Sequence, residues 1–217
     1  MTDKKSGSIA DRIFETIEEK ILNGTFEKGE VLTELGLCEA LSASRTPVRE
    51  ALARLKHEGL LEESAKGNVV AGISEKDLSD IYDIRLRIEG LAAAMCAEHI
   101  TDEQLMQLEE VLALQEFYTD KGSAESIKRL DSEFHVLIYT YCGSRTLSQL
   151  LGELHRKVQR YRRISVENHD RAEAAVKEHR EIYEALVAHD AAKAEELSAK
   201  HIKNAKENIL RQSAFKA

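Results

Sequence analysis

The stretch that decides the fold reads Ser44-Arg45-Thr46-Pro47-Val48-Arg49-Glu50-Ala51-Leu52. Val48 and Leu52 share one face of a helix and the charged residues take the other, as in an amphipathic surface helix. Pro47, the only proline in the chain, falls in the first turn, where its missing N–H has no intrahelical partner to lose. Ser44 is the expected N-cap and Gly59 the expected end, so the pattern predicts one helix between them.

Two helices are expected before this one. The first runs from Ser8 to Asn23, because its isoleucines recur at every fourth residue and Gly24 follows. The second begins near Thr33 and ends at the small polar residues before Arg45. Two helices joined by a short turn are the elements of a helix-turn-helix motif.

The period of the sequence changes after Gly59. Leu60–Glu62 and Val69–Ile73 are short strand-like runs, and the polar turn Ser64–Asn68, which contains a glycine, separates them. Three helices followed by a hairpin predict a winged helix-turn-helix domain over residues 1–73.

The rest of the chain has only helical patterns, joined by short polar connections. The expected helices are Asp77–Glu98, Asp102–Tyr118, Ser123–Tyr141, Ser144–Val166, Arg171–Ala188 and Asp190–Gln212. They predict an antiparallel all-α bundle of about six helices over residues 77–217, attached through a short linker at residues 74–76. The expected fold class is therefore mainly α, with an N-terminal winged helix-turn-helix and a C-terminal bundle.

The composition excludes several classes of protein. With 42% hydrophobic residues, 32% charged residues and a net charge of −8, the chain is neither disordered nor collagen-like. No eighteen apolar residues run together and the first eight residues resemble no signal peptide, so we expect a cytoplasmic protein without a membrane span. The three cysteines are far apart and odd in number, which supports neither a disulfide framework nor a cysteine-type zinc site.

Overall charge does not favour DNA as a partner. Residues 1–73 carry ten Lys and Arg against thirteen Asp and Glu, a net charge of −3. The local balance between Arg45 and Lys56 differs, because four basic residues stand there against one acidic residue. The basic charge is thus concentrated on the helix that follows the tight turn.

The side chains at the start of this helix are suited to reading DNA. Arg45 and Arg49 are four residues apart on one face, and a guanidinium fork matches guanine N7 and O6 in the major groove. Ser44 and Thr46 are suited to phosphate contacts beside the N-terminal amides. From spacing alone, an ordinary solvated amphipathic helix is an equal alternative.

A family resemblance decides between these alternatives. The string Ser44–Leu52, together with Leu55 and the run Glu58-Gly59-Leu60-Leu61, resembles the recognition helix of GntR-family bacterial transcription regulators. With the first helix and the wing, the resemblance covers about seventy residues. DNA binding is therefore the favoured interpretation of the first half.

The resemblance also implies roles for individual residues. It implies base contacts by Arg45 and Arg49, backbone contacts by Ser44 and Thr46, and a wing tip near the minor groove formed by Lys66, Gly67 and Asn68. One position departs from the pattern. Many relatives have a DNA-contacting arginine ten residues before Arg45, whereas this chain has Leu35, so part of the usual base readout is missing.

Four residues of the helical half have the chemistry of a metal site, namely Asp131, His135, His179 and His201. Asp131 and His135 are four residues apart, so both project from one side of a helix toward a single ion. His179 and His201 continue the apolar stripes of their helices and are expected to face the interior. Three histidines and a carboxylate suit an octahedral or tetragonal ion with open positions. A lone inward histidine is more often a hydrogen-bonded core residue.

The same four residues resemble the ligand pattern of the FCD effector-binding domain, which follows this winged helix in the FadR subfamily of GntR regulators. The segment Asp131-Ser132-Glu133-Phe134-His135 and the pair Glu178-His179 are typical of it. The resemblance implies a divalent metal at the floor of a cavity, zinc first and otherwise nickel or manganese, with a small carboxylate as effector. The acyl-CoA-binding branch of the family is an alternative, against which the complete metal set argues.

Two further residues are candidates for contact with the effector. Arg85 lies between Ile81 and Ile88 on the first bundle helix, so it is expected to point inward and bind the second oxygen of a carboxylate. A salt bridge to Glu89 is the alternative role for Arg85. Asn204, one turn beyond His201, is a secondary candidate.

Together these features predict a ligand-responsive transcription regulator, a repressor, and not an enzyme. It is expected to bind an inverted-repeat operator as a homodimer, because one recognition helix reads only a few base pairs. The sequence contains no serine nucleophile elbow, phosphate loop or HExxH motif. A metal-dependent enzyme of the bundle, and a regulator whose metal is structural or is itself the signal, are the alternatives.

Overall fold

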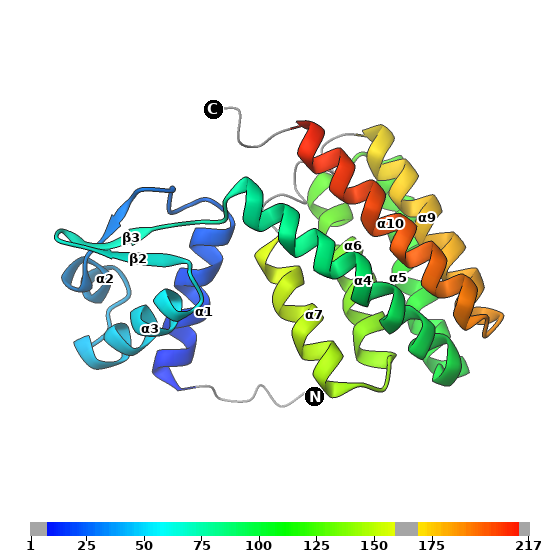
Figure 1. Cartoon of the computed structure of the whole chain (residues 1–217), viewed down its shortest axis with the longest axis horizontal. Helices are drawn as coiled ribbons and strands as arrows, with labels where there is room; N and C mark the ends of the chain where they lie inside the picture. Colours follow the sequence, from blue (N-terminus) through cyan, green and yellow to red (C-terminus); the bar gives the residue numbers. More distant parts are fainter. Residues whose placement is uncertain (1–7, 159–168, 213–217) are drawn as a thin grey trace. The chain divides into compact units, whose positions relative to one another are not determined.

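The computed structural model describes residues 8–158 and 169–212 of the chain. The chain divides after Ser74 into two compact units, which are described separately (Figure 1). Among the described residues, the first unit holds three helices and the three-stranded sheet, and the second unit holds helices only. The expected fold class, a mainly α chain with an N-terminal winged helix-turn-helix and a C-terminal helical bundle, is confirmed.

The three helices of the first unit are α1 (Ile9–Leu22), α2 (Glu34–Ala40) and α3 (Arg45–His57). A capping box between Ser8 and Asp11 begins α1, whose inward face packs against α3. The side chains of Val48 and Leu52 are buried, as the amphipathic pattern of α3 predicts. Ser44 occupies the N-cap position of α3, but its side chain makes no capping hydrogen bond. Its hydroxyl is therefore not committed to the helix.

The sheet of the first unit has three antiparallel strands, β1 (Val31–Leu32), β2 (Leu61–Ser64) and β3 (Gly67–Val70), in the order β1-β3-β2. We did not expect β1, because an alternating pattern is not visible in two residues. The expected turn Ser64–Asn68 was too long. Ser64 pairs with Gly67 across the hairpin, so the turn is only Ala65 and Lys66. The Ser64 hydroxyl donates to the Gly67 carbonyl at 3.0 Å and closes it.

The second unit consists of helices α4 (Glu75–His99), α5 (Asp102–Asp120), α6 (Ala124–Tyr141), α7 (Arg145–Lys157), α9 (His169–Val187) and α10 (Ala191–Gln212). Residues 75 and 76, expected in the linker, form the first turn of α4. The predicted capping box of Thr101 and Gln104 begins α5. The expected helix Ser144–Val166 is described as far as Val158, the C-cap of α7, and its remainder lies outside the described residues.

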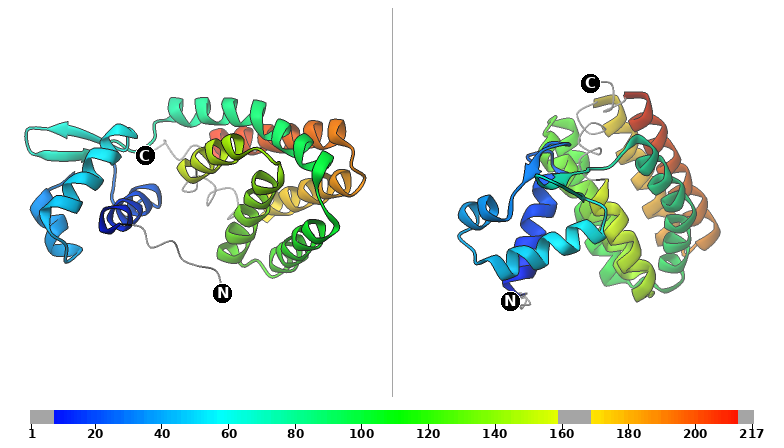
Figure 2. Two further views of the ribbon diagram at one scale, coloured as in Figure 1. Left: turned by 90° about the horizontal axis from the view of Figure 1, so that it is seen from below. Right: turned by 60° about the vertical axis from the view of Figure 1, so that its left-hand side comes forward.

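The core of the second unit contains apolar residues from six helices, including the free thiols of Cys96 and Cys142. Its most extensive helix pair is α4 with α10, which stay side by side in both views of Figure 2. A glycine permits this close approach: a Cβ added at Gly90 would lie 3.0 Å from the backbone carbonyl oxygen of Glu195. Among the described residues, no helix is long and apolar enough to span a membrane.

The contact at Gly90 reverses the usual effect of replacing a helical glycine. Alanine normally stabilises a helix by up to about 1 kcal/mol relative to glycine. We expect Gly90→Ala to lower the free energy of unfolding by about 1–3 kcal/mol instead, because α4 and α10 must move apart. Gly152→Ala on α7 is the control, because its Cβ would meet only the end of the Arg156 side chain at 3.9 Å. This substitution should raise the free energy of unfolding. Urea unfolding measures both, and stabilisation by Gly90→Ala would contradict the tight packing.

Candidate metal centre and nucleic-acid interface

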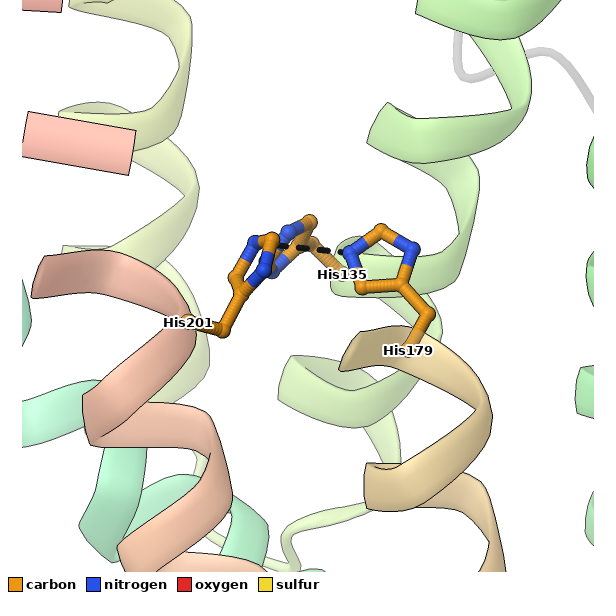
Figure 3. Close-up of side chains that lie close together, drawn as sticks. All are labelled: His135, His179 and His201. Carbon is orange, nitrogen blue, oxygen red and sulfur yellow. Dashed lines mark hydrogen bonds between the residues drawn. The ribbon is translucent and has the colours of Figure 1, made fainter. Parts of the chain in front are cut away.

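Three imidazole rings meet in the interior of the second unit, from three different helices (Figure 3). His135 comes from α6, His179 from α9 and His201 from α10, and each has at most 3% of its surface exposed. One nitrogen from each ring lies within 4.8 Å of the others, and the Nε2 atoms of His179 and His201 are 3.4 Å apart. Tertiary structure therefore brings together three side chains that lie 22 to 66 positions apart in the sequence.

Each of these rings has a polar partner at its Nδ1 atom. His135 Nδ1 lies 3.2 Å from Glu89 Oε2, and His179 Nδ1 lies 2.9 Å from Gln115 Oε1. The corresponding partner of His201 is Glu178 Oε2, at 2.6 Å. An acceptor at Nδ1 holds the proton there and leaves Nε2 as a lone pair, which is how outer residues orient histidine ligands of metals.

The donor set fits a divalent metal ion. Two nitrogens that share a tetrahedral zinc ion at its usual bond length are about 3.3 Å apart, close to the 3.4 Å between His179 and His201. Asp131, the fourth predicted ligand, is also buried, and its Oδ1 lies 3.7 Å from His179 Nε2. The carboxylate therefore lies beside the cluster, one helical turn before His135 on α6.

The electrostatics around His201 depend on Glu178. Burial raises the pKa of this carboxyl, but hydrogen bonds from His201 and Asn204 and the charge of Arg171 lower it to about 2. Asn204 Nδ2 donates to Glu178 Oε1 at 2.7 Å, and Arg171 Nη2 donates to Oε2 at 2.9 Å. Asn204, predicted as a secondary effector contact, thus holds the residue that orients His201.

A small cavity of about 30 Å³ adjoins the cluster. Asp131 and His201 lie in its wall, together with the polar side chains of Arg85, Gln115 and Arg171. The remaining lining is mainly apolar and comprises Ile127, Ala172, Ala175, Ile202, Ala205 and Ile209, with Tyr82. Two guanidinium groups, a carboxylate, an amide and an imidazole thus face an otherwise apolar space, and a few polar groups in an apolar wall are typical of sites for small molecules.

Arg85 lies in this wall and also forms the salt bridge that we considered as its alternative role. Its Nε donates to Glu89 Oε1 at 2.5 Å, and both side chains are at most 2% exposed. Burial acts to lower the pKa of Arg85, but the charge and hydrogen bond of Glu89, together with Tyr139 and Tyr82, outweigh it and hold the pKa above its ordinary value. A chain of contacts therefore runs from Arg85 through Glu89 to His135.

Sequence reasoning missed Glu89 and Gln115 as partners of the histidines. From the sequence we considered Glu89 only as a possible partner of Arg85, and we did not consider Gln115. Both are almost fully buried, at 1% and 0% exposure, although their residue types are usually found at the surface. A polar residue at an interior position of a helix was the available signal, but the partner that it meets comes from another helix.

In the first unit, the predicted DNA-contacting residues of α3 lie on an exposed surface. Ser44, Arg45, Thr46 and Arg49 are exposed, and Val48 between them is buried. The wing residue Lys66 is exposed, whereas Gly67 and Asn68 are half-buried. Gly67 also has a structural role, because its φ of +133° disfavours a side chain and an added Cβ would lie 3.3 Å from the Leu32 carbonyl oxygen.

The basic residues of α3 are less available than their number suggests. Arg49 forms two hydrogen bonds to Glu34 on α2, at 2.9 and 3.1 Å. Arg54 bonds Asp11 of α1 at 2.6 Å, and Lys56 bonds Glu63 of β2 at 3.2 Å. The local excess of positive charge that we counted is thus largely offset by acidic residues distant in sequence. In the described structure, Arg45 is the arginine of α3 without a carboxylate within 4 Å.

The architecture and the comparisons define the class of the protein. An exposed helix after a tight turn, a wing and a separate helical unit are the parts of a winged-helix transcription regulator. Residues 9–69 match the bacterial regulatory proteins of the gntR family, and residues 80–204 match the FCD domain. The chain therefore belongs to the GntR family, in its FCD type.

Individual relatives agree with this assignment. The HTH-type transcriptional regulator YdhC of Bacillus subtilis is 31% identical over 80% of this chain and 78% of its own length. The transcriptional repressor RspR of Escherichia coli is 26% identical over 93% and 89%. The solved structure of McbR/YncC from Escherichia coli has the same fold, with a TM-score of 0.79, 24% identity and coverage of 95% and 99%. These relatives are DNA-binding regulators, not enzymes, so the metal-dependent enzyme is no longer a candidate.

The pair of Arg85 and Glu89 gives a test of the interior electrostatics. Arg85→Met leaves Glu89 buried without its cation, so we expect a loss of about 3–5 kcal/mol in the free energy of unfolding. Arg85→Met combined with Glu89→Gln removes the stranded charge and should recover most of this loss. Lys76→Met is the control, because Lys76 and Asp80 form an exposed pair with the same spacing on α4, and should cost at most about 1 kcal/mol. Equal losses in the single and double variants in urea would contradict the interpretation.

Proposed function

We propose that the protein is a repressor that binds an inverted-repeat operator as a homodimer and responds to a small carboxylate bound beside a divalent metal. In this proposal residues 1–73 bind DNA, residues 74–76 join the domains, and residues 77–217 bind the metal and the effector. The observation that carries it is the buried convergence of three histidines whose Nδ1 atoms already have partners.

The proposed metal ligands are His135, His179, His201 and Asp131. Zinc is the first choice, because three imidazoles and one carboxylate are among its preferred ligands, with nickel and manganese as alternatives. When bound, the cation supplies a positive centre that attracts a carboxylate and fixes its orientation. Arg85, in the wall of the cavity, takes the second carboxylate oxygen as a charge-assisted donor. Asn204 acts indirectly, through Glu178 and His201.

The proposed DNA contacts come from α3 and the wing. Arg45 and Arg49 read bases in the major groove, Ser44 and Thr46 bind phosphate, and Lys66, Gly67 and Asn68 approach the minor groove. Arg49 must release Glu34 before it binds DNA. The free-energy cost is small, because exposed ion pairs contribute about 0–1 kcal/mol. The homodimer places two such helices on the two half-sites of a symmetric operator.

The effector acts by changing the balance between forms of the dimer that do and do not bind DNA. It shifts this balance only as far as its affinities for the two forms differ. The contacts from Arg85 through Glu89 to His135 connect α4, the first helix after the DNA-binding unit, to the metal ligands. Binding at the cavity therefore bears directly on the helix that the DNA-binding unit leads into.

Zinc titration tests the metal centre. His135→Ala, His179→Ala and His201→Ala should each lower zinc affinity by more than about 100-fold, because loss of an outer partner alone costs about 10–100-fold. His155→Ala is the control, since this buried histidine lies beside His135, with ring centroids 5.6 Å apart, but outside the cluster. Competition with a chromophoric zinc chelator gives the affinities. Unchanged zinc binding in all three cluster variants would rule out this site.

Selection from a randomised duplex pool tests the DNA-binding surface. The selected sequences should have two-fold symmetry, and light scattering should give a mass twice the 24.4 kDa of the chain. Arg45→Ala should weaken binding to the selected duplex by about 5–150-fold, the value of one bidentate arginine-guanine contact. Lys56→Ala removes the same charge from the far end of α3 and should change affinity little. Equal effects of the two substitutions would show that Arg45 contributes only charge.

A further inference from the structure

The Gln115 side chain both contacts the histidine cluster and lies in the wall of the cavity. It lies on α5, is 0% exposed and forms part of the cavity wall. Its Oε1 accepts a hydrogen bond from His179 Nδ1 at 2.9 Å. Its amide nitrogen Nε2 is buried and has no hydrogen-bond partner. Buried amide donors are almost always partnered, so this one indicates an acceptor supplied from outside the chain.

The contact with His179 fixes which way the amide faces. When Nε2 of His179 carries the lone pair that faces the other histidines, the proton is on Nδ1, and Nδ1–H needs an acceptor. Oε1 of Gln115 must therefore face His179, and the N–H₂ group is the part left for the cavity. The ring stacking of Phe134 on His179, with centroids 4.4 Å apart, restrains the imidazole and with it the amide.

The other polar groups of the wall restrict which functional groups a ligand of this cavity can carry. Arg85 and Arg171 are cationic donors, so together with Gln115 they offer hydrogen-bond donors to oxygen atoms. An ammonium group in this space would face two guanidinium groups and gain no acceptor from Gln115. The Asp131 carboxylate also lies in the wall, but in the proposed function it is a metal ligand. The cavity, at about 30 Å³, has the size of one or two water molecules, so even an acid of three carbon atoms enters only when the walls move.

We infer that Gln115 is a specificity-determining residue of this cavity, which donates its amide N–H₂ to a second acceptor oxygen of the bound acid. The cavity then selects small 2-oxo or dicarboxylic acids over simple monocarboxylic acids, and excludes amino acids. This inference rests on the proposed function, because it assumes that one carboxylate of the acid is held at the metal. Only the imidazole of His179 lies between Gln115 and the proposed metal position. The acceptor oxygen that Gln115 binds is therefore close, within the acid, to the carboxylate held at the metal.

Calorimetric titration of the zinc-loaded full-length protein with four acids tests the inference. Propionate has no second acceptor, pyruvate has one at C2, malonate has a second carboxylate, and L-alanine has an ammonium group. Pyruvate or malonate should bind at least about tenfold more tightly than propionate, the value of satisfying one buried donor. L-Alanine should not bind. Equal affinities for propionate and the better of the two oxygen-rich acids would overturn the inference.

Two substitutions test the hydrogen-bond donor of Gln115, its amide N–H₂ group, apart from its other contacts. Gln115→Glu keeps an acceptor for His179 Nδ1 and replaces the donor with a second acceptor, so zinc should still bind while the preference for pyruvate or malonate is lost. Gln115→Met removes both polar functions without adding a charge, and should lose the same preference. Gln149→Glu, at an exposed position on α7, controls for the added charge, and this variant should retain the preference for pyruvate or malonate. Retention of the preference in both Gln115 variants would overturn the inference.

The outcomes also distinguish this inference from the proposed function. If acids bind only when zinc is present, but with affinities that do not depend on residue 115, the effector site stands and the role of Gln115 is wrong. If none of the four acids binds the zinc-loaded protein, the carboxylate effector fails and the inference fails with it. The metal is then structural or is itself the signal.

Discussion

The interior of the helical unit is governed by the cost of burying polar groups. Three imidazoles, a guanidinium and several carboxyl or amide groups lie almost fully buried in an otherwise apolar bundle. Such groups are tolerated only when each is paired or hydrogen-bonded, because an unpaired buried charge is strongly destabilising. The contacts of Glu89, Gln115 and Glu178 meet this requirement at the three Nδ1 atoms, and the Nε2 atoms of His179 and His201 lie toward each other. The same contacts therefore satisfy buried polar groups and set the relative orientation of the three histidines.

This arrangement ties the cavity to the helices around it. Arg85 lines the cavity and binds Glu89, which lies beside His135 on α6. Glu178 on α9 joins His201 and Asn204 on α10. Because packed, paired interiors have a few discrete arrangements rather than a continuum, a ligand that changes one of these contacts changes the relative stability of whole helix packings. That is the physical basis of the effector response that we propose.

In the DNA-binding unit, the same pairing of charges has a different result. Acidic partners from α1, α2 and β2 offset most of the basic charge of α3, which agrees with the net charge of −3 over residues 1–73. Arg54 also lies over the ring of Phe14, 4.2 Å from its centroid, so it joins α3 to α1. The DNA recognition that we propose for this unit therefore rests on a few placed side chains, above all Arg45, rather than on a broad positive surface.

The sequence by itself determined the order and type of nearly all elements, since apolar periodicity, caps and the position of Pro47 are local properties. It also identified the family, and it predicted that Asp131, His135, His179 and His201 face the interior of the bundle, because their spacing and stripe positions are visible along single helices. Only the tertiary structure decided which parts of the chain meet. It formed the two-residue strand β1, paired Arg49 with Glu34, and placed Glu89 and Gln115 beside the histidines. Each of these depends on contacts between elements, and the pattern within one helix or strand carries no information about the residue that faces it from another.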